Sequence, residues 1–497
     1  MKQTKIVFIF LLTLHIVDAF SIEVVERWRI HEITLNGTDK VNPFVETSLY
    51  CYFHMGSDTL LVSGFYDGNG QYRIRFSPTK EGEWHYYTVS NQKKLNNKKG
   101  KFICVAPQMQ NQGPVGIDIN NPFTFSYANG NPYYPFGTTL YAWAHQSDSL
   151  AQLTKNTLSK GYFNKVRMCI FPKAYWWNQA EPAIYPFTGD PIEGWDFSQF
   201  NPAFFQNFEK RILQLDSLNI EADIILFHPY DRWGFSKMDS LSNYRYLDYI
   251  IARISSFKNV WWCLANEFDF IENLNIEDWN SLITHIADKD PYDKLISIHN
   301  GIAMYDHKHP LISHASIQSN DIKSIPIWRK NFQKPIIIDE CGYEGNIPWF
   351  WGQLTPEALV AKFWEGVSLG AYVSHGETYL EFINTEQRVE ENDDVLWWSK
   401  GGVLHGKSPE RIAFLREIVA SGSGSREDND ADYIIYFGNN QPALHLIEFP
   451  ENEVYKVTII DTWNMTKCTL EKLYSSYSLI PLPSKPYIAL RIEKLIH

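Results

Sequence analysis

The sequence predicts a (β/α)8 barrel that is flanked by an N-terminal and a C-terminal β-sandwich. Residues 22 to about 105 alternate in β fashion between closely spaced turn signals. From about residue 120, apolar runs alternate with amphipathic segments, and strand patterns return after the small polar linker 421–424. The first and last patterns are typical of sandwiches, and the middle one is typical of a parallel barrel.

The 497 residues are too many for one ordinary domain. The chain begins with a basic start, an apolar stretch at 6–17 and a small-residue exit at Ala19, which is the pattern of a signal peptide. This stretch is too short for a good membrane span, so we expect a secreted or periplasmic protein without membrane insertion. We expect four segments: signal peptide 1–19, N-terminal sandwich 20–110, barrel 111–421 and C-terminal sandwich 425–497.

The barrel strands are expected where short apolar runs occur, at residues 134–141, 165–171, 222–227, 259–265, 294–298, 311–314, 335–340 and 371–374. Helices are expected at the amphipathic segments 150–160, 204–218, 247–257, 356–369 and 409–419. A long loop that is rich in Trp, Tyr, Pro and Gly separates the second strand from its helix, at residues 172–200.

The charge balance argues against a nucleic-acid binder. The formal net charge is -12, and no cluster of Lys and Arg is present that would follow a phosphate backbone. A neutral or cationic substrate fits this balance better than a polyanion. The chain has 17 Trp and 28 Tyr, a surplus that suits stacking on sugar faces.

The six cysteines form no C-x-x-C pair, which argues against a zinc ribbon or a thioredoxin-like site. We expect them to be buried free thiols. A disulfide between Cys51 and Cys104 within the first domain is the alternative.

Two glutamates end apolar strand patterns and are the catalytic candidates. Glu267 follows the run 259–265, and Glu340 ends the run 335–340. The carboxyl ends of barrel strands meet at one rim, so the two acids are expected to face each other there. Paired carboxylates about 5 Å apart are the apparatus of retaining glycosidic bond hydrolysis.

Neighbouring residues are expected to support these acids. Asn266 would donate a hydrogen bond to a sugar hydroxyl, and Arg167, in the second strand, would hold Glu340 ionised. Strand alternation points Asp339 away from Glu340, so we interpret it as structural. Glu344, on a loop past a glycine, is a competing nucleophile.

Other rim residues are candidates for substrate binding, and they are His228, His299, His314, His375, Trp143, Trp177, Tyr343 and Glu377. Each histidine could instead be a hydrogen-bonded rim residue, and Glu377 could only brace the rim. Loop aromatics that could stack on sugar include Tyr141, Trp143, Trp176, Trp177, Trp233, Trp349 and Trp351.

Asn266-Glu267 at the fourth strand, Glu340 at the seventh and an inward Arg167 on the second resemble clan A of the glycoside hydrolases, the large retaining (β/α)8 clan. The resemblance implies that Glu267 is the acid/base and Glu340 the nucleophile. No metal and no organic cofactor are then expected.

The flanking segments narrow the resemblance. Residues 42–44 and 82–84 resemble an N-terminal sandwich of unknown function (DUF5060-like) that precedes such barrels. Residues 396–402, with Arg411, resemble the junction to a C-terminal sandwich (DUF5605-like). The barrel itself is similar to the apiosidase-like group.

The chain departs from the clan at the eighth strand. The clan's Trp is absent from residues 372–375, and Trp397 or Trp398 would substitute for it from a long loop. The loops 172–200 and 380–398 are expected to wall off one end of the cleft, which favours exo-action or short oligosaccharides.

We therefore expect a retaining glycoside hydrolase that acts on a plant or algal polysaccharide or oligosaccharide. A non-catalytic carbohydrate-binding protein on a barrel scaffold is the first alternative. A metal-dependent barrel hydrolase is the second, because four histidines end strands, but such enzymes usually carry His-x-His after the first strand. The oligomeric state stays open.

Overall fold

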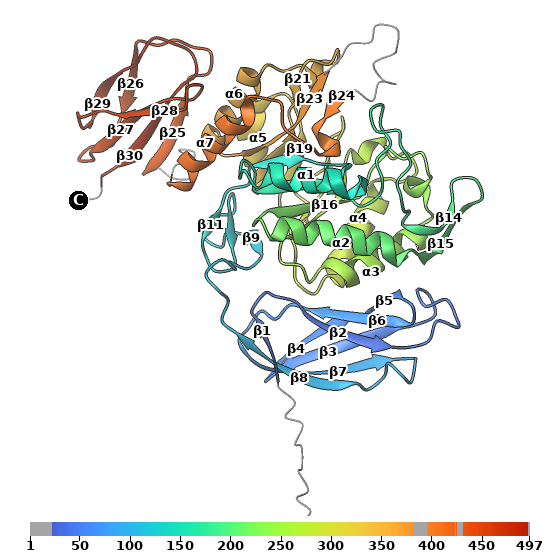
Figure 1. Cartoon of the computed structure of the whole chain (residues 1–497). Helices are drawn as coiled ribbons and strands as arrows, with labels where there is room; N and C mark the ends of the chain where they lie inside the picture. Colours follow the sequence, from blue (N-terminus) through green and yellow to red (C-terminus); the bar gives the residue numbers. More distant parts are fainter. Residues whose placement is uncertain (1–21, 381–394, 423, 425–430, 496–497) are drawn as a thin grey trace, which may run out of the picture.

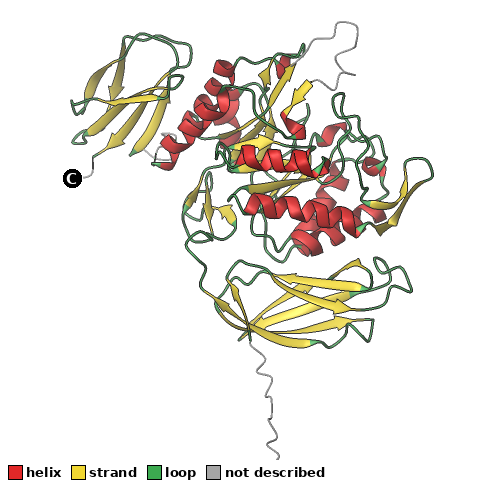
Figure 2. Cartoon of the chain, viewed as in Figure 1, coloured by secondary structure: helices red, strands yellow, loops and turns green. Residues whose placement is uncertain are grey.

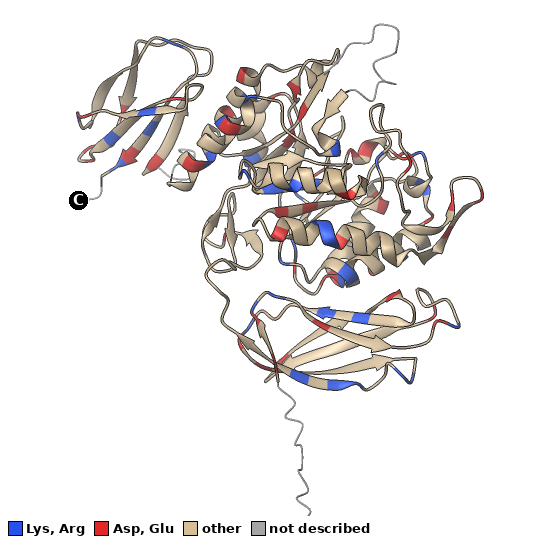
Figure 3. Ribbon diagram, viewed as in Figure 1, with Lys and Arg blue, Asp and Glu red and all other residues tan. Residues whose placement is uncertain are grey.

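The protein has three parts that follow one another along the chain (Figure 1). The computed structural model describes residues 22–380, 395–422, 424 and 431–495. The predicted signal peptide at 1–19 and most of the loop 380–398 lie outside the described residues. Acidic and basic residues are intermixed along all three parts (Figure 3).

The N-terminal part is a sandwich of two sheets, with strand orders β1-β8-β7-β3-β4 and β2-β6-β5. Its strands are β1 (Glu23–Glu26), β2 (His31–Asn36), β3 (Leu49–Met55), β4 (Asp58–Ser63), β5 (Phe65–Gly68), β6 (Gln71–Phe76), β7 (Gly82–Ser90) and β8 (Lys99–Val105). Alternate residues of β3, namely Leu49, Cys51 and Phe53, point into the sandwich core. This period of two is what places one face of each strand in the core.

The C-terminal part is a second sandwich, with the sheets β25-β30-β27-β28 and β26-β29. Its strands are β25 (Asp432–Tyr436), β26 (Leu444–Glu448), β27 (Tyr455–Asp461), β28 (Thr466–Thr469), β29 (Tyr477–Pro481) and β30 (Ile488–Lys494). The two sandwiches confirm the flanking domains of the predicted fold class.

Eight parallel strands form the barrel in the order β18-β17-β16-β13-β12-β22-β20-β19. They are β12 (Gly137–Thr139), β13 (Lys165–Cys169), β16 (Glu221–Phe227), β17 (Val260–Ala265), β18 (Ile296–Ser297), β19 (Ala315–Gln318), β20 (Ile336–Glu340) and β22 (Tyr372–His375). A parallel bridge between His299 and Ser316 joins the two end strands and closes the barrel. The predicted (β/α)8 barrel is thereby confirmed.

The α-helices pack around the strands (Figure 2). They are α1 (Asp148–Leu158), α2 (Pro202–Asp216), α3 (Ser240–Ile254), α4 (Ile276–Lys289), α5 (Ile325–Phe332), α6 (Pro356–Ser368) and α7 (Ser408–Ala420). Short 3-10 helices are η1 (Trp143–His145), η2 (Phe235–Lys237), η3 (Phe268–Phe270), η4 (Ile322–Ser324), η5 (Phe350–Gly352) and η7 (Trp398–Lys400). Residues 298–314, between β18 and β19, contain no helix, so one of the eight expected βα units lacks its helix.

Two local expectations are corrected. The sixth strand is Ala315–Gln318 and not 311–314, because four consecutive residues from Ala315 pair with β20, whereas Leu311 is exposed. The expected long loop 172–200 contains a hairpin of β14 (Phe187–Asp190) and β15 (Gly194–Phe200).

A small sheet covers the amino end of the barrel. It consists of β9 (Val115–Ile117), β10 (Phe125–Tyr127) and β11 (Pro132–Tyr133). Phe125 and Tyr133 of this sheet pack with Trp261, Ile337 and Tyr372 in one buried cluster. Apolar side chains therefore fill the barrel at this end, and the carboxyl end is where barrel active sites lie.

The N-terminal sandwich joins the barrel through buried charges. Arg253, on α3, is fully buried and pairs with Asp67 at 2.8 Å and with Glu209, on α2, at 2.6 Å. Arg75, from β6, also pairs with Glu209 at 2.9 Å. Tyr249 donates its hydroxyl to the carbonyl of Tyr66 at 2.9 Å. Charges of each part therefore neutralise charges of the other.

All six cysteines are free, and five of them are buried. The expectation of buried thiols is confirmed for those five, and the alternative of a Cys51–Cys104 disulfide is wrong. Within the described residues, every helix is too short or too polar to cross a bilayer.

Candidate active site

A pocket of about 320 Å³ opens at the carboxyl end of the barrel and contains both predicted catalytic acids. Its wall is formed by Tyr141, Lys173, Tyr175, Tyr230, Glu267, Gly301, Ile302, Gln318, Ser319, Asn320, Glu340, Gly342, Tyr343, Phe350, Trp351 and Trp397. Aromatic walls with a few converging polar groups are typical of a small-molecule site.

Glu267 follows β17, whose residues are all buried, as expected for a strand covered on both faces. Its backbone is left-handed, with φ 51° and ψ 55°. A non-glycine residue adopts this conformation at a cost, and such residues cluster at functional sites. Asn266 donates its amide to Glu267 Oε2 at 3.1 Å, and Tyr230 also forms a hydrogen bond with this carboxyl.

Glu340 is the last residue of β20 and is half-buried. Tyr141 donates its hydroxyl to Glu340 Oε1. The Tyr141 ring is itself buried, and its pKa is raised far above the usual value by burial and by the charge of Glu340. Tyr141 therefore stays protonated and keeps the Glu340 carboxylate in one orientation.

Gln318, the last residue of β19, lies between the two acids. With its amide nitrogen turned toward them, it donates to Glu267 Oε1 at 3.2 Å and to Glu340 Oε2 at 3.3 Å. These two carboxylate oxygens can be no farther apart than the sum of the two distances, about 6.5 Å. Strands four and seven thus bring their acids together across the pocket.

The environment of Glu267 favours its protonated form. Burial raises the pKa of this carboxyl to about 7, and the nearby charge of Glu340 acts in the same direction. Lys173, Tyr230 and Gln318 act against this rise. A carboxyl with a pKa near neutrality can both donate and accept a proton at physiological pH.

Arg167 does not contact Glu340 as expected. Its guanidinium lies 3.4 Å from Asp339 and 3.6 Å from Asp223 inside the barrel, and it donates to Asn266 Oδ1 at 3.4 Å. The reason is strand alternation, which turns Asp339 into the barrel beside Arg167. Asp339 pairs with Arg167 inside the barrel, which fits the structural role predicted for it. Arg167 reaches the acid pair through Asn266, which donates to Glu267, and through Tyr141, whose ring lies 5.9 Å from the guanidinium.

The four predicted rim histidines do not line the pocket. His314 precedes β19 and packs against Phe125 and Trp261 at the amino end, so its expected place at the rim is wrong. His228 is bonded to the Phe171 carbonyl at 3.1 Å, and His375 to Thr138 at 3.0 Å.

His299 is fully buried in the barrel interior. Burial and the charge of Arg167 hold its pKa well below the usual value. Its neutral ring therefore fills the barrel core beneath the pocket, and it does not provide a ligand for a sugar at the rim.

Of the predicted tryptophans, neither Trp143 nor Trp177 lines the pocket. Trp143 is buried in the barrel core. Trp177 is fully buried and packs against Trp351 and Trp397, both of which do line it. Of the two residues expected to substitute for the strand-eight Trp, Trp397, on β24 (Val395–Trp397), lines the pocket, whereas Trp398 donates to Thr138 at 2.8 Å in the core.

Tyr343, a predicted substrate-binding residue, lines the pocket and forms hydrogen bonds with Tyr141 and Thr139. It therefore steadies the tyrosine that orients Glu340.

Glu344 and Glu377 lie in the small sheet of β21 (Glu344–Gly345), β23 (Glu377–Leu380) and β24. Glu344 accepts hydrogen bonds from Tyr379 at 2.6 Å, from the backbone of Lys407 at 2.8 Å and from Ser408 at 3.0 Å. Glu377 accepts from the backbone of His405 at 2.7 Å and of Gly406 at 3.0 Å. Both carboxyls therefore brace the rim.

Glu344, His375 and Glu377 lie close enough together for a metal ion. Four donors fill the Glu344 carboxylate, two of them from Ser408, so no lone pair of that carboxylate is directed at such an ion. Glu344 is also excluded as the competing nucleophile, because its side chain is fully buried and lies outside the pocket.

Among the pocket residues that the sequence did not indicate are Lys173, Tyr175, Tyr230 and Gln318. Tyr230 follows the strand-end residue His228 by two positions, a spacing that could have indicated it. Lys173 comes directly after the second strand, but nothing in its neighbouring residues marks it.

A pair of acids in an aromatic pocket at the carboxyl end of a (β/α)8 barrel defines the protein as a glycoside hydrolase. The chain belongs to the apiosidase-like family, whose catalytic domain matches residues 120–414. Domains of unknown function match on either side: DUF5060 at residues 24–91 and DUF5605 at residues 421–493. No curated protein matches the chain.

Solved structures are consistent with this assignment. A putative glycoside hydrolase from Bacteroides vulgatus ATCC 8482 is 36% identical, with a TM-score of 0.88, over 95% of this chain and 100% of that one. A family 5 glycoside hydrolase from the same organism is 12% identical, with a TM-score of 0.59, over 77% of this chain and 93% of the other, and shares the fold.

Proposed function

We propose that the protein is a retaining glycoside hydrolase, with Glu267 as the acid/base and Glu340 as the nucleophile. The observation that carries this proposal is the Gln318 amide, which bonds to both acids and limits the separation of their oxygens to about 6.5 Å. Inverting enzymes separate their carboxyls by roughly 6.5 to 9.5 Å to admit a water molecule, and retaining enzymes by about 5 Å. The raised pKa of Glu267 supports its role as the acid.

The reaction follows in two displacements. Glu267 donates its proton to the leaving oxygen while Glu340 attacks the anomeric carbon and forms a covalent glycosyl ester. Glu267, now ionised, takes a proton from water, which attacks the same carbon and releases Glu340. Gln318 and Tyr141 hold the two carboxylates in register throughout.

The substrate we propose is a chain end or a short oligosaccharide of plant or algal origin. The pocket is closed below by the barrel core, and Trp351 and Trp397 form part of its wall. Phe350 lines it with 71% of its surface exposed, and exposed Trp176 packs on Trp349 nearby. Such rings suit further sugars that extend toward solvent. The signal-peptide pattern at 1–19 supports our proposal that the protein is secreted or periplasmic.

The test is hydrolysis of plant and algal glycans by wild type, Glu267→Gln and Glu340→Gln, with the anomer of the first product followed by NMR. We expect retained configuration, and loss of turnover in both variants. An aryl glycoside with an acidic leaving group needs no proton from Glu267, so Glu267→Gln should still form the glycosyl-enzyme with it and release a burst of phenol, whereas Glu340→Gln should not.

Glu272, an exposed acid five residues after Glu267, provides the matched control, and Glu272→Gln should behave as wild type. A first product of inverted configuration would contradict the retaining assignment. Turnover that survives Glu340→Gln would remove Glu340 as nucleophile. Sugar binding without turnover on any substrate would favour a carbohydrate-binding protein.

A further inference from the structure

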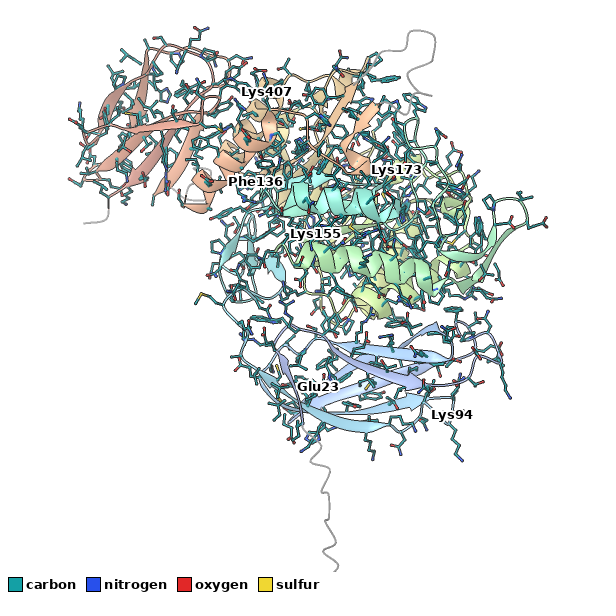
Figure 4. All side chains as sticks on the ribbon, in the orientation of Figure 1. Glu23, Lys94, Phe136, Lys155, Lys173 and Lys407 are labelled. Atoms are coloured by element: carbon teal, nitrogen blue, oxygen red, sulfur yellow. The ribbon has the colours of Figure 1, made fainter. Side chains whose placement is uncertain are left out.

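Lys173 places a positive charge in the wall of the pocket, within a cage of aromatic rings. Its ammonium lies 4.1 Å from the ring centre of Tyr230 and 4.3 Å from that of Tyr141. The rings of Tyr175 and Trp397 are each 5.6 Å away. All five side chains line the pocket, and Lys173 is labelled in Figure 4.

This lysine differs from the other buried lysines of the described chain. Lys165 pairs with Asp223 at 2.7 Å and Asp339 at 2.9 Å, and Lys294 donates to the carbonyl of Phe257 at 2.7 Å. Lys173 is only 5% exposed, yet within the described residues its ammonium forms neither an ion pair nor a hydrogen bond. Its donors are therefore available to a ligand.

A ring cage attracts the ammonium but does not neutralise it. Glu267 is close enough for Lys173 to lower its pKa, but the two side chains form no ion pair within the described residues. A buried charge is costly unless an opposite charge meets it, so this wall favours a bound anion. A sugar hydroxyl would accept one hydrogen bond and leave the charge unbalanced.

A second donor stands beside the ammonium. Burial and the charges of Glu267 and Glu340 raise the pKa of Tyr175, so its hydroxyl stays protonated. That hydroxyl forms no hydrogen bond within the described residues, and Tyr175 lines the pocket next to Lys173. Two donors, one of them charged, suit the two or three oxygens of an anionic group.

We propose that the sugar bound beside Glu267 and Glu340 carries an anionic substituent, a carboxylate or a sulfate ester, and that Lys173 receives it. This inference rests on the proposed function and names the substrate class. It agrees with a net charge of -12, because charges more than about 8 Å apart at the surface are screened and do not decide the potential of one pocket. The negative surface disfavours a polyanion, whereas the pocket selects a single acidic sugar.

The test is calorimetric titration of the whole protein with D-galacturonate, D-glucuronate and D-galactose 6-sulfate, each beside its neutral parent sugar. We expect at least one acidic sugar to bind about tenfold or more tightly than its parent. Lys173→Met, which keeps the length and apolar stem of the side chain, should abolish this preference and leave the neutral sugars within about twofold. Lys173→Arg should retain part of the preference, because it retains the charge.

Lys94→Met is the matched control, because Lys94 is an exposed lysine of the N-terminal sandwich, and it should change nothing. Equal affinity for acidic and neutral sugars in wild type would overturn the inference. An equal loss of affinity for acidic and neutral sugars in Lys173→Met would also overturn the inference. The lysine would then maintain the shape of the pocket wall and would not recognise the anion. A preference for carboxylate or for sulfate identifies the substituent.

The two proposals fail separately. Hydrolysis of a neutral glycan that depends on both glutamates, with no preference for acidic sugars, would leave the function standing and refute the anionic substrate. Tight binding of an acidic sugar that is lost in Lys173→Met, with no turnover of any glycoside, would support the anion site and refute the hydrolase function.

Discussion

Replacing Glu340 by glutamine should lower the pKa of Glu267, because it removes a negative charge that raises this pKa. The pKa of Glu267 is about 7, and burial and Glu340 raise it. At the largest oxygen separation that Gln318 allows, about 6.5 Å, and an effective dielectric of about 20, Coulomb's law gives roughly 2.5 kcal/mol. Delocalisation over the carboxylate reduces this, so we expect the pKa of Glu267 to fall by roughly one to two units.

The measurement is carbon-13 NMR of the glutamate side-chain carboxyls across pH, with Glu267→Gln to assign the signal. The control is Glu272→Gln, an exposed acid whose loss should leave the pKa of Glu267 unchanged. In wild type, kcat/KM should fall above about pH 7, since a carboxyl with a raised pKa loses its proton there. An unchanged pKa in Glu340→Gln would show that burial alone raises it, and would refute the coupling of the two acids.

Three further outcomes are expected. Asn266→Ala removes the hydrogen bond to Glu267 and the acceptor for Arg167, so kcat/KM should fall about 100-fold while circular dichroism stays that of wild type; an unchanged kcat/KM would rule out this positioning role. Glu344→Ala strands buried donors, and urea denaturation should show a loss of about 3 kcal/mol or more, whereas a loss near zero would contradict the bracing role. The pKa of Glu377 is raised to about 8 by burial, so the folded protein keeps a proton that the unfolded chain loses above about pH 4.5. Stability from this group therefore declines as pH rises from about 4.5 to 8, and the melting temperature of Glu377→Gln relative to wild type should climb over that range.

The two acids could be located from sequence because each depends on a local signal. Glu267 and Glu340 end apolar runs, and barrel geometry brings the carboxyl ends of strands together without further information. The predicted rim histidines also end apolar runs, but they do not line the pocket. For His314, an error of four residues in the strand boundary moves the side chain from one end of the barrel to the other. For His299, the ring turns into the core.

Lys173 could not be located from sequence because its function depends on distant residues. The rings that surround it come from Tyr141, Tyr230 and Trp397, which follow different strands of the barrel. No pattern in the sequence indicates that the segments carrying these three rings meet. The partner of Arg167 was mistaken for a related reason, since Asp339 and Glu340 are adjacent in sequence but lie on opposite sides of β20.

The buried charges between the N-terminal sandwich and the barrel limit how this protein can be divided. Arg253 lies in α3, but it pairs with Asp67 of the sandwich. In the same way, Arg75 of the sandwich pairs with Glu209, which lies in α2 of the barrel. A barrel cut free of its sandwich would expose or strand these charges, at a cost of several kcal/mol for each uncompensated ion. Accessory modules joined by flexible linkers can be gained, lost or exchanged between genes. This sandwich shares buried ion pairs with the barrel, so we expect the two to fold together and to be kept or lost together.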